Sequence, residues 1–74
     1  MIRGDSEVIR EKVDFFMKSK VKVHIDLDDG TFLNGHILKK SRDNIYWLNE
    51  RKLGNIFLFV KDIKNIREYK ERGL

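Results

Sequence analysis

The sequence predicts a mainly β domain with an N-terminal α-helix, built as a strongly bent five-stranded antiparallel sheet or small barrel. Hydrophobic residues recur with a helical period in the first twenty positions and with the strand period of two from residue 21 onward. The chain has 74 residues, a length that supports one thin core and a single domain. We therefore expect one domain over residues 1–74, with a helix over about 6–18, strands over about 21–69 and a polar tail at 70–74.

The helix prediction depends on an apolar stripe at positions i, i+4, i+7 and i+8. Its members are Ile9, Val13, Phe16 and Met17. Ser6 is a suitable N-cap, because its side chain can accept a hydrogen bond from a free backbone N–H. Lys18 and Lys20 follow at the C-terminal end, where the helix dipole favours cations. The stripe indicates that one face of this helix packs on a core.

The first strand is predicted over 21–27, where apolar and polar residues alternate without a break. The Asp-Asp-Gly-Thr segment at 28–31 then favours a tight hairpin turn, since Gly30 tolerates positive φ. A second strand follows over about 32–40. Gly35 lies inside it, and a glycine there is typical of a bulge, a sharp bend or a close backbone approach.

The rest of the chain alternates polar connections with short strands. We expect a loop at 41–44, a strand at 45–48, a charged connection at 49–52, a strand at 56–60 and a last strand from 63 toward 69. The segment 56–60 is apolar on both faces. An open edge of this kind promotes aggregation, so we expect it to be covered, closed into a barrel or paired with another chain.

Composition excludes several classes of protein. The chain contains no Cys, which removes disulfides and thiolate metal sites and favours a reducing compartment. Its longest apolar run is five residues, whereas a membrane span needs about 20. The N-terminal residues are too charged for a secretory signal. We therefore predict a cytoplasmic protein, which at this size is best stabilised by oligomerisation.

Catalytic and metal-binding patterns are weak. His24 and Asp26 share the polar face of the first strand and can meet as an i, i+2 pair, but a solvated strand face explains them as well. The acidic residues before Gly30 lack the spacing and the distal Glu of a calcium-binding EF-hand loop. We predict no enzymatic activity, no metal site and no cofactor.

Positive charge gathers after the second strand. Lys and Arg number 16 against 12 Asp and Glu, which gives a net charge of +4. Lys39, Lys40 and Arg42 precede the Asp43-Asn44 loop. A solvated face accounts for a charge this modest, but a ring of copies would multiply it.

The order of elements and two segments resemble the Sm and LSm family, most closely its bacterial-type branch, the Hfq RNA chaperones. The segments are VKVHIDLDDGTFLNGHIL at 21–38 and FVKDIKNI at 59–66. The resemblance covers about residues 9–69. It implies an SH3-like small barrel with the helix laid across it, and a ring of six copies that join strand four of one copy to strand five of the next.

The resemblance also implies a function: a homo-oligomeric ring that binds single-stranded, U-rich RNA and acts as an RNA chaperone in post-transcriptional regulation. The family's pore-face RNA site falls on four residues, which are Arg42, Asp43, Asn44 and Lys61. Its basic rim corresponds to Lys18 and Lys20. On the pore face, Asp43 replaces the family's stacking aromatic residue. On the opposite face, Asp26 replaces the family's adenine-stacking tyrosine, which argues against an adenine site there. The alternative is an Sm-like or SH3-like barrel that serves as a protein-assembly module without RNA binding.

Overall fold

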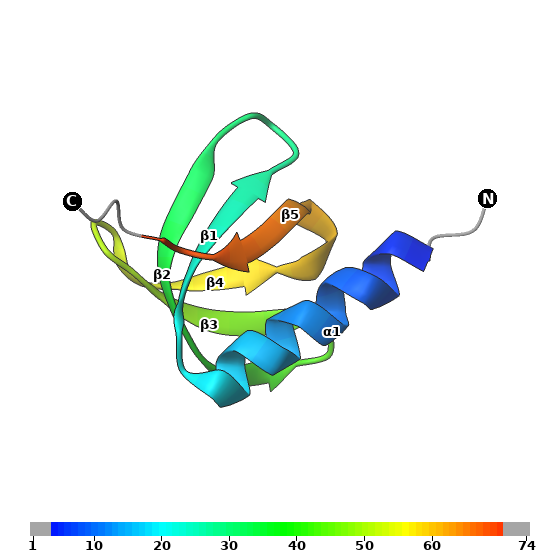
Figure 1. The fold of residues 1–74 in the computed structure, drawn as a ribbon, viewed down its shortest axis with the longest axis horizontal. Helices are drawn as coiled ribbons and strands as arrows, with labels where there is room; N and C mark the ends of the chain where they lie inside the picture. The colour runs from blue at the N-terminus through cyan, green and yellow to red at the C-terminus, as the bar shows by residue number, and fades with distance from the viewer. Residues whose placement is uncertain (1–3, 71–74) are drawn as a thin grey trace.

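The computed structural model describes the backbone of residues 4–70 and the side chains of residues 7–70. One N-terminal helix is followed by five strands (Figure 1), so the predicted mainly β class with a leading helix is confirmed. The elements in chain order are α1 Gly4–Ser19, β1 Lys22–Leu27, β2 Phe32–Arg42, β3 Ile45–Glu50, β4 Gly54–Phe59, the 3₁₀ helix η1 Val60–Asp62, and β5 Ile63–Glu68. Of the predicted polar tail at 70–74, residues 71–74 lie outside the described residues.

Several predicted boundaries are wrong by a few residues. Strand β3 continues to Glu50 beyond the predicted end at 48, and β4 begins at Gly54 instead of 56. Helix α1 already runs through Ser6, so the helix does not start there and Ser6 is not its cap; the side chain of Ser6 lies outside the described part. Strand β2 extends to Arg42, which reduces the predicted loop at 41–44 to a two-residue turn. Strand β4 ends at Phe59, and Val60 belongs to η1.

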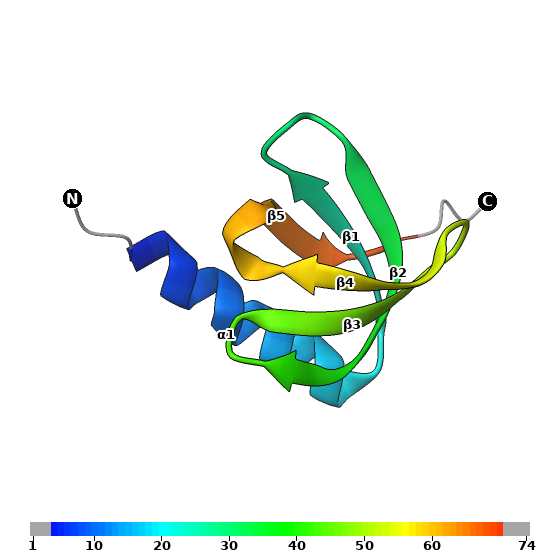
Figure 2. The ribbon, with the colours of Figure 1, turned by 180° about the vertical axis from the view of Figure 1, so that it is seen from behind.

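The five strands form one antiparallel sheet in the order β4-β3-β2-β1-β5 (Figure 2). Strand β2 curves so that its first half pairs with β1 and its second half with β3, and the ladder with β3 shifts register at Ile37/Lys39 and Lys40/Arg42. Within residues 4–70, β4 and β5 are the two edges and do not pair with each other. The sheet is therefore bent but not closed into a barrel.

Gly35 lies at the centre of the bend, where β2 pairs with Val23 of β1 and Glu50 of β3. A Cβ atom added to Gly35 would lie 2.1 Å from the backbone oxygen of Asn49, a distance that no real side chain tolerates. The prediction that this glycine marks a close backbone approach is confirmed. Only glycine lets the two strands pass at this separation.

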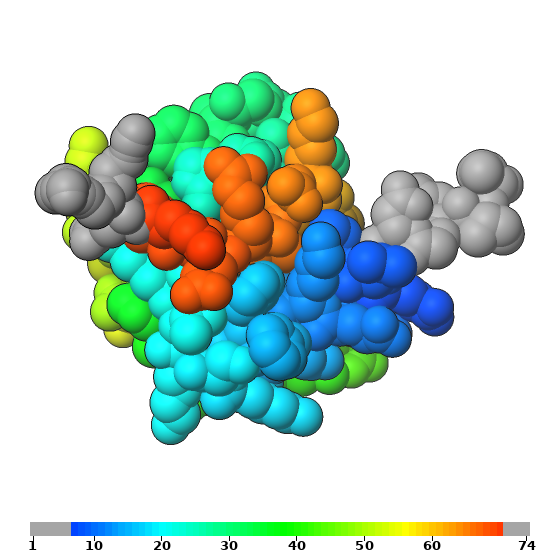
Figure 3. Space-filling view, in the orientation of Figure 1, coloured from blue at the N-terminus to red at the C-terminus, as the bar shows by residue number. Residues whose placement is uncertain are grey.

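The core lies between α1 and the concave side of the sheet. Val13 and Ile9 of the predicted helical stripe are buried, while Phe16 and Met17 pack against the core from its margin. The buried residues contributed by the sheet and η1 are Val23, Ile25, Ile37, Tyr46, Leu48, Leu58, Val60, Ile63 and Ile66. Helix α1 packs against β5, β2 and η1, and Figure 3 shows α1 and β5 on adjacent parts of one face.

Two buried or half-buried carboxylates hold elements together. Asp14 of α1 accepts a 2.5 Å hydrogen bond from the hydroxyl of Tyr46, a fully buried residue of β3. Glu50, at the end of β3, is buried and accepts backbone N–H groups from Asn34 at 3.1 Å, Lys52 at 2.7 Å and Leu53 at 2.9 Å. These contacts attach the helix to the sheet and fix the β3–β4 turn to β2.

The β1–β2 hairpin turns as predicted. Gly30 has φ of +92°, a value that favours glycine. Asp29 accepts the Thr31 hydroxyl at 2.6 Å and the Thr31 backbone N–H at 3.0 Å, and these two bonds lower the pKa of Asp29. Asp29 therefore has a structural role in the turn.

Candidate functional site

A pocket of about 410 Å³ lies where α1, the β2–β3 turn, β4 and η1 meet. Its lining residues are Arg10, Asp43, Asn44, Ile45, Phe59, Val60 and Lys61. Val60 is buried, Ile45 is half-buried, and Phe59 is 37% exposed, so the apolar part of the lining comes from the sheet and η1. An apolar hollow edged by a few polar side chains is typical of ligand sites.

Asn44 lines this pocket and is bonded to two of the other residues that line it. It occupies the β2–β3 turn with φ of +64°, a conformation that Asn adopts more readily than most residues. Its backbone oxygen accepts the N–H of Val60 at 2.9 Å, which joins the turn to η1. Its side-chain Oδ1 accepts a hydrogen bond from Nη1 of Arg10 at 3.4 Å. The fold thus brings a helix residue to a turn 34 positions later in the chain.

The charged residues at the rim are well exposed. Lys61 has 81% of its side chain exposed, and its Nζ lies 3.7 Å from Asp62. Asp43 is 97% exposed, with Oδ1 3.8 Å from Nζ of Lys40. Ion pairs this exposed contribute little to stability, so Lys61 can exchange its partner for a ligand at small cost.

The structure brings together three of the four residues predicted for the pore-face site. Asp43, Asn44 and Lys61 line the same pocket, although η1, which carries Lys61, follows the β2–β3 turn only after β3 and β4. Arg42, the last residue of β2, is exposed and does not belong to the lining. The pocket therefore contains the predicted site without Arg42.

The two residues predicted for a rim site lie at the other end of α1. Lys18 is in the last turn, and Lys20 follows with φ of +57° and its N–H bonded to the carbonyl of Phe16 at 3.0 Å. Lys18 is eight residues beyond Arg10, or about 12 Å along the helix axis. These lysines form a separate basic area.

The sequence patterns did not predict Arg10, Ile45 or Phe59 as pocket residues. Arg10 lies on the polar side of the helical stripe, where nothing in the sequence distinguishes it from Lys12. Phe59 was expected only as part of an apolar strand. The register Ile45↔Phe59, which places these two residues together, is a long-range pairing that the sequence does not reveal.

Three aromatic residues line the outer side of β3 and β4. The ring centroids of Trp47 and Phe57 lie 4.3 Å apart, and those of Phe57 and Phe59 lie 6.2 Å apart. Phe57 belongs to the edge strand β4, and 47% of it is exposed. We call Trp47, Phe57 and Phe59 the aromatic face. Large apolar side chains exposed together often mark an interaction surface.

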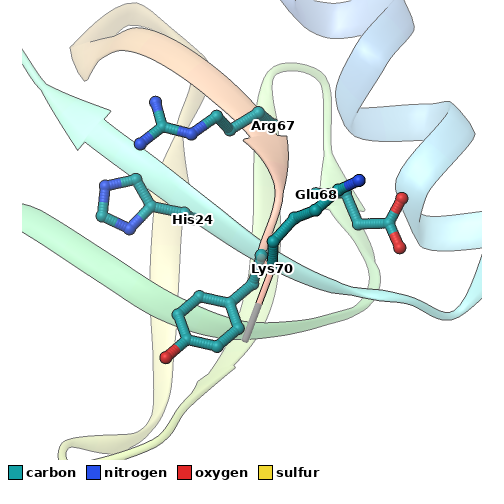
Figure 4. Close-up of a pocket in the computed structure, with 5 residues that line it drawn as sticks. His24, Arg67, Glu68 and Lys70 are labelled. Carbon is teal, nitrogen blue, oxygen red and sulfur yellow. The ribbon is translucent and has the colours of Figure 1, made fainter. Parts of the chain in front are cut away.

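A second pocket, of about 390 Å³, lies on the outer side of β1 and β5. Figure 4 shows His24 and Arg67 on one side of it, with Glu68 directed away from both. The Nδ1 atom of His24 lies 2.7 Å from Oδ1 of Asn34, and its Nε2 atom lies 3.0 Å from Oδ1 of Asp26. The predicted His24–Asp26 contact is therefore confirmed. Arg67 adds a 3.4 Å ion pair to Asp26. Both ring nitrogens are engaged, which is typical of a structural network.

In the part of the chain that the structure describes, no cluster of three or more His, Asp or Glu is placed to hold a metal ion. Nor does any helix there have the length and apolar character to cross a membrane. No family model matches the sequence, and no curated protein matches it at a significant level. The chemistry of the first pocket is therefore inferred from its own residues.

Proposed function

We propose that the protein is an Hfq-like, Sm-type RNA-binding protein, a homo-oligomeric ring that holds single-stranded, U-rich RNA and acts as an RNA chaperone in post-transcriptional regulation. The observation that carries this proposal is the first pocket, which gathers Arg10, Asn44 and Lys61 around an apolar lining. In this proposal the protein acts by binding RNA and catalyses no reaction.

The pocket has the two kinds of surface that an unpaired nucleotide needs. A base released from a helix can lie against Ile45 and Phe59, and its edge can be read by the amide of Asn44. Lys61, at the exposed rim, can pair with a neighbouring phosphate. Stacking on an aromatic ring together with cation–phosphate contacts is the usual chemistry of single-strand binding.

The open edges of the sheet support the ring. Strands β4 and β5 have six residues each, and within residues 4–70 each is paired on one side only, β4 with β3 and β5 with β1. A second copy that adds its β5 beside β4 would continue the sheet and cover Phe57, and repeated contacts of this head-to-tail kind close into rings. Six copies would carry about six times the +4 of one chain, which favours RNA and makes binding sensitive to salt.

The second candidate function is a protein-assembly module of Sm-like or SH3-like type without RNA binding. The aromatic face favours it, since Phe57 and Phe59 expose apolar area that a protein partner would cover. Asp43 favours it too, because a carboxylate at the rim of the pocket repels phosphate.

Native mass spectrometry of the protein, alone and with short U-rich and A-rich RNAs, separates the two candidates. We expect a species of about six or seven times 8.9 kDa that takes up the U-rich RNA. Lys61→Ala should weaken that uptake, while Lys12→Ala, the same charge change at an exposed position of α1 outside the pocket, should not. A monomer or dimer that ignores both RNAs would leave the assembly module as the better candidate.

The rim lysines have their own test. Replacing Lys18 and Lys20 together by Ala should weaken binding of long RNAs more than binding of short ones, because only a long strand reaches from the pocket to the far end of α1. Affinity for both lengths is measured by fluorescence anisotropy. An equal loss for both lengths would argue against a separate rim site.

A further inference from the structure

We propose that Arg10 is a positioning residue: it fixes the amide of Asn44 so that the side chains converging on the pocket offer hydrogen-bond donors, and the pocket thereby prefers uracil to cytosine. This inference rests on the proposed function, namely that the pocket binds single-stranded RNA. It adds the residue that sets base preference, Arg10 of α1.

The side chain of Asn has two different ends. The carbonyl oxygen accepts hydrogen bonds, whereas the NH₂ group donates them, and the neighbours decide which end faces a ligand. The guanidinium of Arg10 can only donate, so the Oδ1 atom of Asn44 turns toward it at 3.4 Å. The NH₂ group of Asn44 is then the end left for a ligand.

The other polar groups at the pocket agree with this polarity. The backbone oxygen of Asn44 already accepts the N–H of Val60 at 2.9 Å, which uses one of its two lone pairs. Lys61 carries three donors and no acceptor, and Arg10 keeps further N–H groups beyond the one bonded to Asn44. Asp43 is the one carboxylate of the lining, and it lies at the exposed rim with Lys40 3.8 Å away.

A donor-rich pocket distinguishes the two pyrimidines. Uracil presents the acceptors O2 and O4, whereas cytosine replaces O4 by an amino group that donates. An amino group placed against the NH₂ of Asn44 or the ammonium of Lys61 leaves both sides without a partner. Sites built to pair with one group reject the analogue that lacks it. We expect a preference for U over C of about tenfold.

The test compares the affinities of two six-nucleotide RNAs, one of uridines and one of cytidines, for the full-length protein and its variants by fluorescence anisotropy. The variants are Arg10→Ala, Asn44→Gly and the double variant. Glycine is the substitution of choice at Asn44, because it keeps the turn at φ of +64° and removes only the side chain. Lys12→Ala is the control for loss of one positive charge from the exposed side of α1.

The ratio of the two affinities is the measurement that decides. We expect Arg10→Ala to reduce the U/C ratio about tenfold toward one, Asn44→Gly to do the same, and the double variant to add nothing further, since both act through one amide. Lys12→Ala should leave the ratio unchanged. Thermal unfolding of each variant shows whether the fold is intact.

Two results would overturn the proposal, and they differ from each other. If Arg10→Ala weakens binding of both RNAs equally, Arg10 is a phosphate contact and does not set base preference. If the wild-type protein binds neither RNA, the proposed function itself fails, and the role of Arg10 in it fails too.

Discussion

At the scale of single residues, Glu50 is the clearest case of a buried charge with a structural task. Burial raises the pKa of its carboxyl group, but the N–H groups of Asn34, Leu53 and Lys52 and the charge of Arg51 outweigh burial, so the pKa is lower than the usual 4.5. A carboxylate whose pKa is lowered in the folded state stabilises the protein above the pKa of the unfolded chain. That stabilisation is lost as the pH falls through the folded-state pKa.

We expect Glu50→Gln to lower the free energy of unfolding at pH 7 by about 1–3 kcal/mol, because an NH₂ group would then face the buried N–H of Asn34. We also expect the loss of stability between about pH 5 and pH 3 to be smaller in this variant than in the wild type. Urea unfolding followed by circular dichroism at several pH values measures both effects. Glu11→Gln, at an exposed position of α1, is the control. Identical pH profiles for wild type and Glu50→Gln would contradict the assignment.

The residues that the sequence predicted correctly are those whose role is local. Asp29 and Gly30 form the turn that their order predicts, and Gly35 lies where two backbones approach closely. Arg10 and Phe59 meet through long-range packing of α1 and β4 around the β2–β3 turn. Periodicity reports which side of an element is buried, but it does not report which exposed residue of one element meets which residue of another.

At the scale of elements, the bend of β2 depends on Gly35. We expect Gly35→Ala to lower the free energy of unfolding by at least about 3 kcal/mol or to prevent folding, because the new methyl group would collide with the carbonyl of Asn49. Gly30→Asn is the matched control. Gly30 also has positive φ, but nothing lies within 4 Å of its missing side chain, so a loss of about 1 kcal/mol is expected there. Thermal and urea unfolding compare the two, and losses of equal size would show that backbone crowding does not fix the bend.

The elements themselves were well predicted, and their ends less so. Alternation in β1 placed Val23 and Ile25 in the core correctly. The polar run after Lys40 was interpreted as a loop, yet β2 continues to Arg42, because its exposed residues still pair with Tyr46 and Ile45 of β3. Where a strand extends beyond the core, its backbone pairing continues but its alternation of apolar and polar residues stops. A prediction from alternation alone therefore places the end of the strand too early.

At the scale of the whole molecule, the unpaired edge β4 is the feature that the ring proposal explains. We expect Phe57→Lys to yield a folded species of monomer mass and to weaken binding of U-rich RNA at least tenfold, since a charge on an edge strand opposes strand addition and the ring's multiple contacts are lost. Sedimentation velocity measures the mass of the assembly, and fluorescence anisotropy measures its affinity for U-rich RNA. Phe15→Lys, which changes a residue of α1 that is 63% exposed, is the control. A full-size assembly in the Phe57→Lys variant would show that the β4 edge is not the interface between copies.

The sequence predicts that the apolar segment 56–60 is covered, closed into a barrel or paired with another chain. In the structure the outer edge of β4 has no partner strand within residues 4–70, and Phe57 and Phe59 are exposed. Closure of a sheet depends on strand number, tilt and register together, and register is a property of partner strands rather than of any one segment.

Helix α1 carries parts of both the core and the pocket. Val13 is fully buried, Asp14 holds the hydroxyl of Tyr46, and Arg10, one turn before Asp14, reaches over the pocket. The position of Arg10 is therefore only as well defined as the packing beneath it. A random-mutagenesis screen for lost ligand binding would return Val13 and Tyr46 along with Arg10. Such a screen has to be paired with a stability measurement before any of its hits is interpreted as a contact with the ligand.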